Sequence, residues 1–152
     1  MNKNTIIFDL DGTLANIDAR RELATKPNGK LDWDVFFDSS NIKLDVPNEP
    51  VVKMAQMFAE NGFTIVILSG RSDKTKHTTR SWLTHNKIPF HKLVMRDSKT
   101  NHFTPDDILK KDMLDKHVDI NDVFLVVDDR NKVVKMWRDL GLNTFQVAEG
   151  DF

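Results

Sequence analysis

Short apolar runs, rich in β-branched residues, alternate along the chain with longer amphipathic stretches. The short runs predict strands at Thr5–Leu10, Phe63–Leu68, Lys92–Met95, Val123–Val127 and Thr144–Val147. The amphipathic stretches predict helices at about Glu49–Asn61, Lys74–Asn86, Pro105–His117 and Asn131–Leu140. Strands that alternate with helices form a mostly parallel sheet with helices on both faces. We therefore predict an α/β fold that is Rossmann-like and three-layered, with a sheet of about five strands.

The segment from Ala15 to Pro47 interrupts this alternation directly after the first predicted strand. Pro27-Asn28-Gly29 predicts a turn in its middle, with a possible short helix on either side. Ligands of such sheets bind at the carboxyl ends of the strands. We expect residues 15–47 to be a small cap-like insertion over that end of the first strand, within a single domain of residues 1–152.

The strongest chemical signal is IIFDLDGTLA, residues 6–15, where an apolar strand runs into two aspartates. Because side chains alternate along an extended chain, Asp9 and Asp11 should point to the same side. Two carboxylates held that close need a cation between them or a proton on one of them. Asp9 suits nucleophilic attack on phosphorus, and Asp11 suits proton exchange with the leaving group and water. Gly12 permits a backbone turn, and the Thr13 hydroxyl can bind the transferred phosphate or lock the loop.

Two further motifs stand at predicted strand ends. In ILSGR, residues 67–71, Ser69 and the amide of Gly70 can donate to phosphate oxygens, and Arg71 adds positive charge. In VVDDR, residues 126–130, Asp128 and Asp129 offer the carboxylate oxygens that magnesium prefers. Taken singly, each motif is also typical of an ordinary turn or an exposed helix start.

The candidate site also needs a positive charge to face the phosphate. ILKKDMLDK, residues 108–116, places several lysines on a predicted helix near the strand ends. We choose Lys110, although the spacing alone does not separate it from Lys111.

The ordered set DLDGT, SGR, helix lysine and DD resembles the four motifs of the haloacid-dehalogenase (HAD) superfamily of phosphohydrolases. This resemblance spans nearly the whole chain. It implies that Asp9 is the nucleophile, Asp11 the general acid–base, Ser69 a phosphate-binding residue and Lys110 the charge-neutralising lysine. Dehalogenase members lack the second aspartate of the first motif, so Asp11 favours phosphate-ester chemistry.

The same resemblance implies Mg²⁺ as the cofactor. The ion would bridge Asp9, the main-chain carbonyl of Asp11 and one acid of the last pair, with Asp128 the first choice and Asp129 the second.

A closer resemblance is to the 3′-phosphatase domain of phage-type polynucleotide kinase–phosphatases. VVDDRNKVVKMWRDLGLNTFQVAEGDF, LVMRD around Arg96, and SGRSDKTKHTTRSWL carry it. It implies that Arg96 helps to bind the substrate phosphate or the nucleic-acid backbone. The GxxxxGK[ST] loop of the companion 5′-kinase domain does not occur in this sequence, so we expect no kinase activity from it.

Composition narrows the classes of protein. Lys plus Arg number 22 and Asp plus Glu 23, so nucleic-acid binding would need a local basic patch and not bulk charge. Lys74, Lys76 and Arg80 are either such a patch or a solvated helix face. The sequence has no cysteine, which excludes disulfides and thiolate chemistry. No apolar run is long enough to span a bilayer and no signal peptide is evident, so we expect a cytoplasmic protein without membrane contact.

Other side chains have simpler interpretations. Trp33, Phe36 and Phe37 could stack on a base, but packing of the insertion onto the body is favoured. The five histidines show no spacing typical of metal ligands.

We predict a phosphatase acting on 3′-phosphorylated DNA or RNA ends, because the small insertion leaves room for a polymer end. The enzymatic alternative is a nucleotidase on free 3′- or 5′-mononucleotides. A non-catalytic end-binding module is the third alternative. No obligate protein partner is apparent from the sequence.

Overall fold

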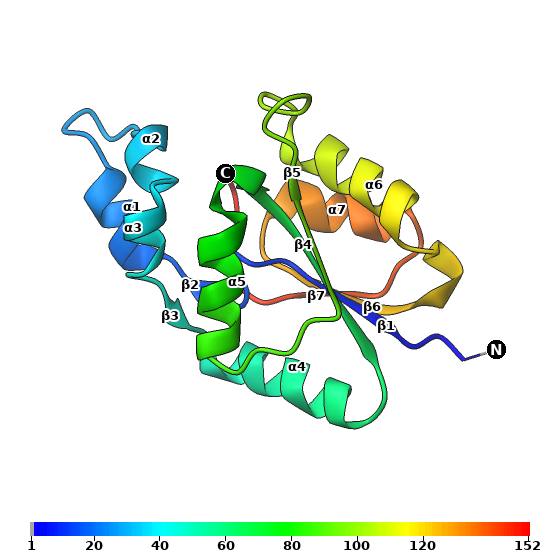
Figure 1. Cartoon of the computed structure of the whole chain (residues 1–152). Coiled ribbons are helices and arrows are strands. Elements are labelled where there is room, and N and C mark those ends of the chain that lie inside the picture. The colour runs from blue at the N-terminus through cyan, green and yellow to red at the C-terminus, as the bar shows by residue number, and fades with distance from the viewer. Residues whose placement is uncertain (1) are drawn as a thin grey trace.

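A five-stranded parallel sheet forms the centre of the protein in a computed structural model, which describes residues 2–152 (Figure 1). The strands are β1 (Thr5–Phe8), β4 (Thr64–Ser72), β5 (Lys92–Arg96), β6 (Val123–Asp128) and β7 (Thr144–Gln146). Their order is β5-β4-β1-β6-β7, and every neighbouring pair is parallel. The predicted α/β fold with a parallel sheet of about five strands is confirmed. Because β1 is central, the residues that follow it lie between the ends of β4 and β6.

Two pairs of helices cover the two faces of this sheet (Figure 1). α4 (Glu49–Glu60) and α5 (Lys76–His85) pack on one face, and α6 (Asp106–His117) and α7 (Asn131–Asp139) pack on the other. Alternation along β1 divides its side chains between these layers: Ile6 and Phe8 face α4 and α5, whereas Ile7 faces α6 and α7. Within residues 2–152, none of the helices has the length and apolar character needed to cross a membrane.

Several element ends differ from the predicted ones. β4 continues to Ser72, so the second motif lies within the strand, where the register with β5 shifts between Ser69 and Ser72. A 3₁₀ turn, η1 (Asp73–Thr75), precedes α5, and a second one, η2 (Ile120–Asp122), precedes β6. α6 begins one residue later than predicted, with Pro105 as its N-cap residue, and the Thr104 hydroxyl donates to the side chain of Asn101.

The cap-like insertion has its own small structure beside the end of β1 (Figure 1). β2 (Ala15–Asn16) pairs antiparallel with β3 (Val46–Pro47), which brings the two ends of the insertion together. Between them lie α1 (Asp18–Ala24), α2 (Trp33–Phe36) and α3 (Ser39–Ile42), where the sequence suggested two helices. Helices this short are not stable alone, so the insertion depends on side chains that it buries, such as Phe36 and Ile42.

Candidate active site

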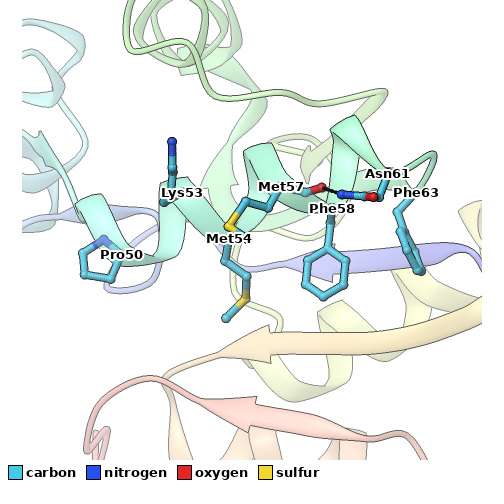
Figure 2. A pocket seen from close by; sticks show the side chains of 7 residues that line it. All are labelled: Pro50, Lys53, Met54, Met57, Phe58, Asn61 and Phe63. Carbon is cyan, nitrogen blue, oxygen red and sulfur yellow. Dashed lines mark hydrogen bonds between the residues drawn. The ribbon is translucent and has the colours of Figure 1, made fainter.

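One cavity collects most of the predicted chemical residues, whereas Thr13 and Arg71 lie outside its lining. It has a volume of about 510 Å³ and lies where the insertion, the loop before α6 and the ends of β1, β4 and β6 meet. A second hollow of about 570 Å³ lies along α4 and is apolar (Figure 2). There Met54 and Phe58 point toward the strands, and Lys53 is the one charged residue in the lining. The α4 hollow therefore lacks the groups that phosphate chemistry needs, and the candidate site is the first cavity.

Asp9 follows β1 directly and is 6% exposed. Lys110 Nζ donates to its Oδ1 at 2.7 Å, and the Thr13 hydroxyl donates to its Oδ2 at 2.9 Å. Both Asp9 oxygens are thereby oriented, and Thr13 has the second of its two predicted roles, that of locking the loop. Lys110 is buried in the site, whereas Lys111 is on the surface and pairs with Asp115, so the structure separates the two lysines.

Asp9, Asp128 and Asp129 form a buried acidic cluster, with one carboxylate oxygen of each lying within 4.8 Å of the others. Burial raises the pKa of Asp9 well above its ordinary value; Lys110 opposes the rise, and Asp128 and Asp129 add to it. Burial likewise raises the pKa of Asp129. Three carboxylates share one lysine, so the cluster retains negative charge that a hard divalent cation would neutralise. The donor set fits Mg²⁺.

The two acids of the last motif have different surroundings. Asp128 Oδ2 accepts hydrogen bonds from Lys110 Nζ at 3.1 Å and Trp137 Nε1 at 3.0 Å, and its Oδ1 accepts from the Asp129 amide at 2.8 Å. The Asp129 carboxylate instead lies over Gly12, where an added Cβ would be 2.2 Å from its Oδ2. Direct metal ligation therefore suits Asp129 better than Asp128, the reverse of the order implied by the family resemblance.

Asp11 is held by two arginines. Its Oδ1 accepts from Arg20 Nη2 at 2.7 Å and from Arg71 Nε and Nη2 at 2.9 and 2.6 Å. Asp45 accepts from both guanidinium groups and completes a buried network. Burial works to raise the pKa of Asp11, but Arg71 and Arg20 outweigh it and lower the pKa. Oδ2 of Asp11 accepts no hydrogen bond within residues 2–152, which leaves it available for proton transfer.

The position of Arg71 differs from the prediction that it binds the substrate. Its side chain is buried, and its guanidinium contacts Asp11, Asp45 and Thr79 rather than the cavity. Sequence position after Ser-Gly suggested a phosphate ligand, but β4 continues through Arg71 and directs the side chain inward. Arg71 therefore positions the candidate acid–base.

Ser69 and Gly70 do line the cavity. The Ser69 hydroxyl accepts a hydrogen bond from the Arg71 amide at 3.1 Å, which leaves its proton free for a phosphate oxygen. A Cβ on Gly70 would be 2.4 Å from Asp106 Oδ1, so the close approach of α6 requires glycine here.

Arg96 also lines the cavity, but the structure places its guanidinium differently from the prediction. Its Nε donates to the carbonyl of Gly70 at 2.9 Å, and its Nη1 donates to the carbonyls of Asn101 and Thr104, both at 2.7 Å. Asp106 lies 3.6 Å from Nη2. Arg96 thus holds the loop between β5 and α6 in place instead of facing a substrate phosphate.

The remaining predicted contacts are divided. Trp33, Phe36 and Phe37 all line the cavity, and of the three Phe36 is buried, with the Arg20 guanidinium over its ring. Lys74, Lys76 and Arg80 are exposed and lie outside the cavity lining.

Sequence reasoning missed Arg20 and Asp45. Arg20 is fully buried although it lies in a charged stretch of a short helix, and Asp45 lies just before β3. Arg20 is nine positions from Asp11, and Asp45 is 25 and 26 positions from its partners Arg20 and Arg71. No local sequence pattern marks either residue.

Comparisons with known proteins agree with this geometry. The model of the polynucleotide kinase PNKP phosphatase domain matches residues 3–152. A protein of Autographa californica nuclear polyhedrosis virus, named "Putative bifunctional polynucleotide kinase/RNA ligase", is 31% identical over 143 residues, which are 91% of this chain and 18% of the viral protein.

Solved structures extend the comparison. A chain in the structure of a Pnkp1/Rnl/Hen1 complex is 33% identical with a TM-score of 0.82, covering 99% of this chain and 48% of that one. L-2-haloacid dehalogenase from Xanthobacter autotrophicus shares the fold at 15% identity, with a TM-score of 0.63 over 97% of this chain and 78% of the dehalogenase. The chain thus spans less than half the length of the first relatives that it matches. The expected family is confirmed: the chain belongs to the PNKP phosphatase domain family, within the HAD fold.

Proposed function

We propose that this domain is a magnesium-dependent phosphatase that removes a 3′-phosphate from nucleic-acid ends through an aspartyl-phosphate on Asp9. The observation that carries the proposal is that two carboxylates with different hydrogen-bond partners line one open cavity. Asp9 is oriented by Lys110 and Thr13, and Asp11 is held by Arg20 and Arg71. One is prepared to bond to phosphorus and the other to exchange a proton.

In the first step a carboxylate oxygen of Asp9 bonds to phosphorus as the bond from phosphorus to the 3′ oxygen breaks. The departing 3′ oxygen takes a proton from Asp11, which yields a 3′-hydroxyl end. Arg20 and Arg71 lower the pKa of Asp11 and so favour its carboxylate form. The entering phosphate anion opposes them, since nearby negative charge raises a carboxyl pKa, and Asp11 takes up its proton from solvent as the substrate binds. Lys110 and the Ser69 hydroxyl face the transferred group.

In the second step water attacks the phosphorus of the aspartyl-phosphate. Asp11 takes a proton from that water, and the bond between phosphorus and Asp9 breaks. Inorganic phosphate leaves, Asp9 is again a carboxylate, and Asp11 is again protonated. Asp9 and Asp129, with the Asp11 carbonyl, would hold Mg²⁺, which when bound neutralises charge on the phosphoryl oxygens.

Three features favour a nucleic-acid end as the substrate. The family is that of polynucleotide kinase phosphatase domains. The viral relative is named as a polynucleotide kinase/RNA ligase, and a second structure of the Pnkp1/Rnl/Hen1 assembly is called an RNA repair complex. The insertion is small, and α1–α3 leave the cavity open enough to admit a chain end. The same cavity, at about 510 Å³, would also hold one nucleotide, which keeps a 3′- or 5′-nucleotidase as the second candidate.

Protein partners also enter the proposal. The Pnkp1 structure is that of a complex with Rnl and Hen1, and the viral relative is named for two activities in one chain. We therefore propose that this domain works beside other enzymes that process nucleic-acid ends, a role that its sequence alone did not indicate.

The test compares phosphate release from 3′-phosphorylated DNA and RNA oligomers, a 3′-mononucleotide and a 5′-mononucleotide, each with Mg²⁺ or EDTA. We expect the highest kcat/KM for a 3′-phosphorylated oligomer in Mg²⁺, falling as salt rises because backbone phosphates contribute to binding. Equal efficiency on oligomer and mononucleotide, without a salt effect, would favour the nucleotidase. No release from any substrate would favour a non-catalytic end-binding module.

A further inference from the structure

Two exposed aromatic side chains lie at the rim of the active-site cavity and come from different parts of the chain. Trp33 begins α2 in the insertion and is 59% exposed. Phe103 lies in the loop between β5 and α6 and is 91% exposed. Both line the cavity that holds Asp9. Exposed rings of this size beside a polar site indicate a ligand with an apolar face.

The Trp33 ring packs against two phenylalanine rings of the insertion. It stacks on Phe37 with centroids 5.8 Å apart and an interplanar angle of 16°, and it meets Phe36 edge-on at 5.7 Å. The Asp32 carboxylate caps the helix by accepting from the amides of Asp34 and Val35. These contacts hold the Trp33 ring in place and leave the rest of its surface exposed.

Phe103 is placed by the loop that Arg96 holds. The carbonyls on both sides of it, those of Asn101 and Thr104, accept from Arg96 Nη1. His102 contacts the Phe103 ring edge-on at 4.5 Å and supports one side of it. The contacts of Arg96 therefore hold the backbone that carries the exposed Phe103 ring at the rim of the cavity.

The other aromatic side chains that line the cavity are already engaged. Phe36 is buried, with the Arg20 guanidinium 4.4 Å from the centre of its ring. Phe152 has guanidinium groups of Arg21 and Arg130 at 5.2 and 5.0 Å. Phe37 lies against Trp33. Trp33 and Phe103 are the two whose rings retain large exposed areas without such cationic neighbours among residues 2–152.

We propose that Trp33 and Phe103 form a stacking site for nucleobases at the 3′ end of the substrate, an inference that rests on the proposed function. Every base has an aromatic face, so stacking would bind ends of any sequence while Asp9 acts on the phosphate. It would also require an unpaired terminus, because a paired base cannot leave its stack without cost. The substrate class is therefore a single-stranded or frayed 3′-phosphorylated end.

The test measures kcat and KM for Trp33→Ala, Phe103→Ala and Trp33→Phe on three substrates. These are a short 3′-phosphorylated oligomer, the same oligomer with abasic nucleotides at its 3′ end, and glycerol 2-phosphate, which has no aromatic ring. We expect each alanine variant to raise KM for the normal oligomer about five- to 100-fold. KM for the abasic oligomer and glycerol 2-phosphate should stay near wild type, and Trp33→Phe should retain most of the oligomer affinity.

The chain's tryptophans allow a direct binding measurement. The other two, Trp82 and Trp137, are buried at 7% and 0% exposure, so a ligand that stacks on Trp33 should quench the accessible fluorescence. We expect the normal oligomer, but not the abasic one, to quench Asp9→Asn protein, and neither to do so when Trp33→Phe is added.

The outcomes separate the two proposals. Unchanged oligomer KM in both alanine variants, or an equal loss on glycerol 2-phosphate, overturns the stacking site and leaves the phosphatase proposal standing. A wild type that hydrolyses glycerol 2-phosphate but no 3′-phosphorylated oligomer overturns the proposed function, and base-dependent quenching in Asp9→Asn protein would then still support the stacking site.

Discussion

Arg20 Nη2 in the cap-like insertion donates a 2.7 Å hydrogen bond to Asp11 Oδ1 at the end of β1. This contact couples the insertion to the residue proposed to exchange protons with the substrate. Arg20 is fully buried and also pairs with Asp45. The insertion must therefore be folded for Arg20 to hold Asp11 in this position.

Replacing Arg20 should therefore reduce both stability and turnover. Arg20→Ala leaves Asp45 buried with one partner fewer, a loss that costs about 3–5 kcal/mol of unfolding free energy. Loss of an oriented acid–base group costs about 10²–10⁴ in rate, and we expect kcat to fall toward that range. Urea unfolding and turnover of p-nitrophenyl phosphate measure the two effects.

Arg20→Lys provides the second variant if the alanine variant does not fold. Lysine keeps the charge but cannot reproduce the paired donors, so kcat should fall while the fold persists. Arg80→Ala, on the exposed face of α5, is the matched arginine control and should retain wild-type turnover of the small substrate. Wild-type kcat in folded Arg20→Lys would contradict the positioning role.

Asp9→Asn should abolish turnover without loss of the fold. In the proposed mechanism Asp9 forms the covalent intermediate, and removal of one indispensable group typically costs several orders of magnitude. Burial and the neighbouring acids already raise the pKa of Asp9, so removal of its charge should leave the metal-free protein at least as stable as wild type. Single-turnover assays and thermal unfolding in EDTA provide the measurements. Activity within about tenfold of wild type, from sequence-verified protein, would remove Asp9 from the nucleophile role.

Mg²⁺ should stabilise the folded protein as well as support activity. A ligand that binds only the native state adds about 2.7 kcal/mol at 100 times its Kd, so the Tm should rise as MgCl₂ is titrated. Asp129→Asn should lose most of that rise, because its carboxylate faces the cluster without the hydrogen bonds that occupy Asp128. Asp112→Asn, on the exposed face of α6, should respond to Mg²⁺ like wild type. Equal Tm shifts in Asp129→Asn and wild type would rule out the ligand assignment.

Alanine variants of Gly12 and Gly62 test whether close packing against Asp129 matters for the site. Both have positive φ, 84° and 86°, so alanine brings similar backbone strain at each. At Gly12 an added Cβ would be 2.2 Å from Asp129 Oδ2, whereas at Gly62 nothing lies within 4 Å. We expect Gly12→Ala to raise the Mg²⁺ concentration needed for half-maximal activity by at least about tenfold and Gly62→Ala to leave it unchanged. The same Mg²⁺ dependence in both variants would show that the contact with Asp129 is unimportant.

Arg96→Ala should loosen the loop between β5 and α6. The guanidinium donates to three carbonyls, of Gly70, Asn101 and Thr104, and none of these bonds survives the change. Hydrogen exchange should increase within residues 97–104, and KM for a 3′-phosphorylated oligomer should rise more than KM for p-nitrophenyl phosphate. Lys99→Ala, in the same loop but with an exposed side chain, is the control. Unchanged exchange in the loop of Arg96→Ala would contradict its anchoring role.

Much of the fold and part of the site followed from local sequence pattern. The spacing of apolar residues located the strands and the helices that cover the sheet. This was possible because buried side chains recur at different intervals in a helix and in a strand, which a few residues suffice to show. The aspartates of the first and last motifs follow strands, so their meeting at one edge of a parallel sheet was predictable. Arg71 and Arg96 were recognised as residues of the site, but the direction of each side chain depends on long-range contacts with Asp45 and the loop carbonyls.

By itself, the sequence determined the succession of the sheet's strands and its covering helices along the chain, the position of Asp9 and Asp11 after the first strand, and the family. These depend on the alternation of apolar and polar residues and on motifs a few residues long. Such patterns are local, so they can be recognised in one segment of the chain without knowledge of the other segments. Only the tertiary structure decided that Lys110 and not Lys111 contacts Asp9, that Asp129 is the freer acid, and that Arg20 and Asp45 belong to the site. The physical reason is that charges in a buried site depend on distances between atoms whose residues are tens of positions apart, and packing alone sets those distances.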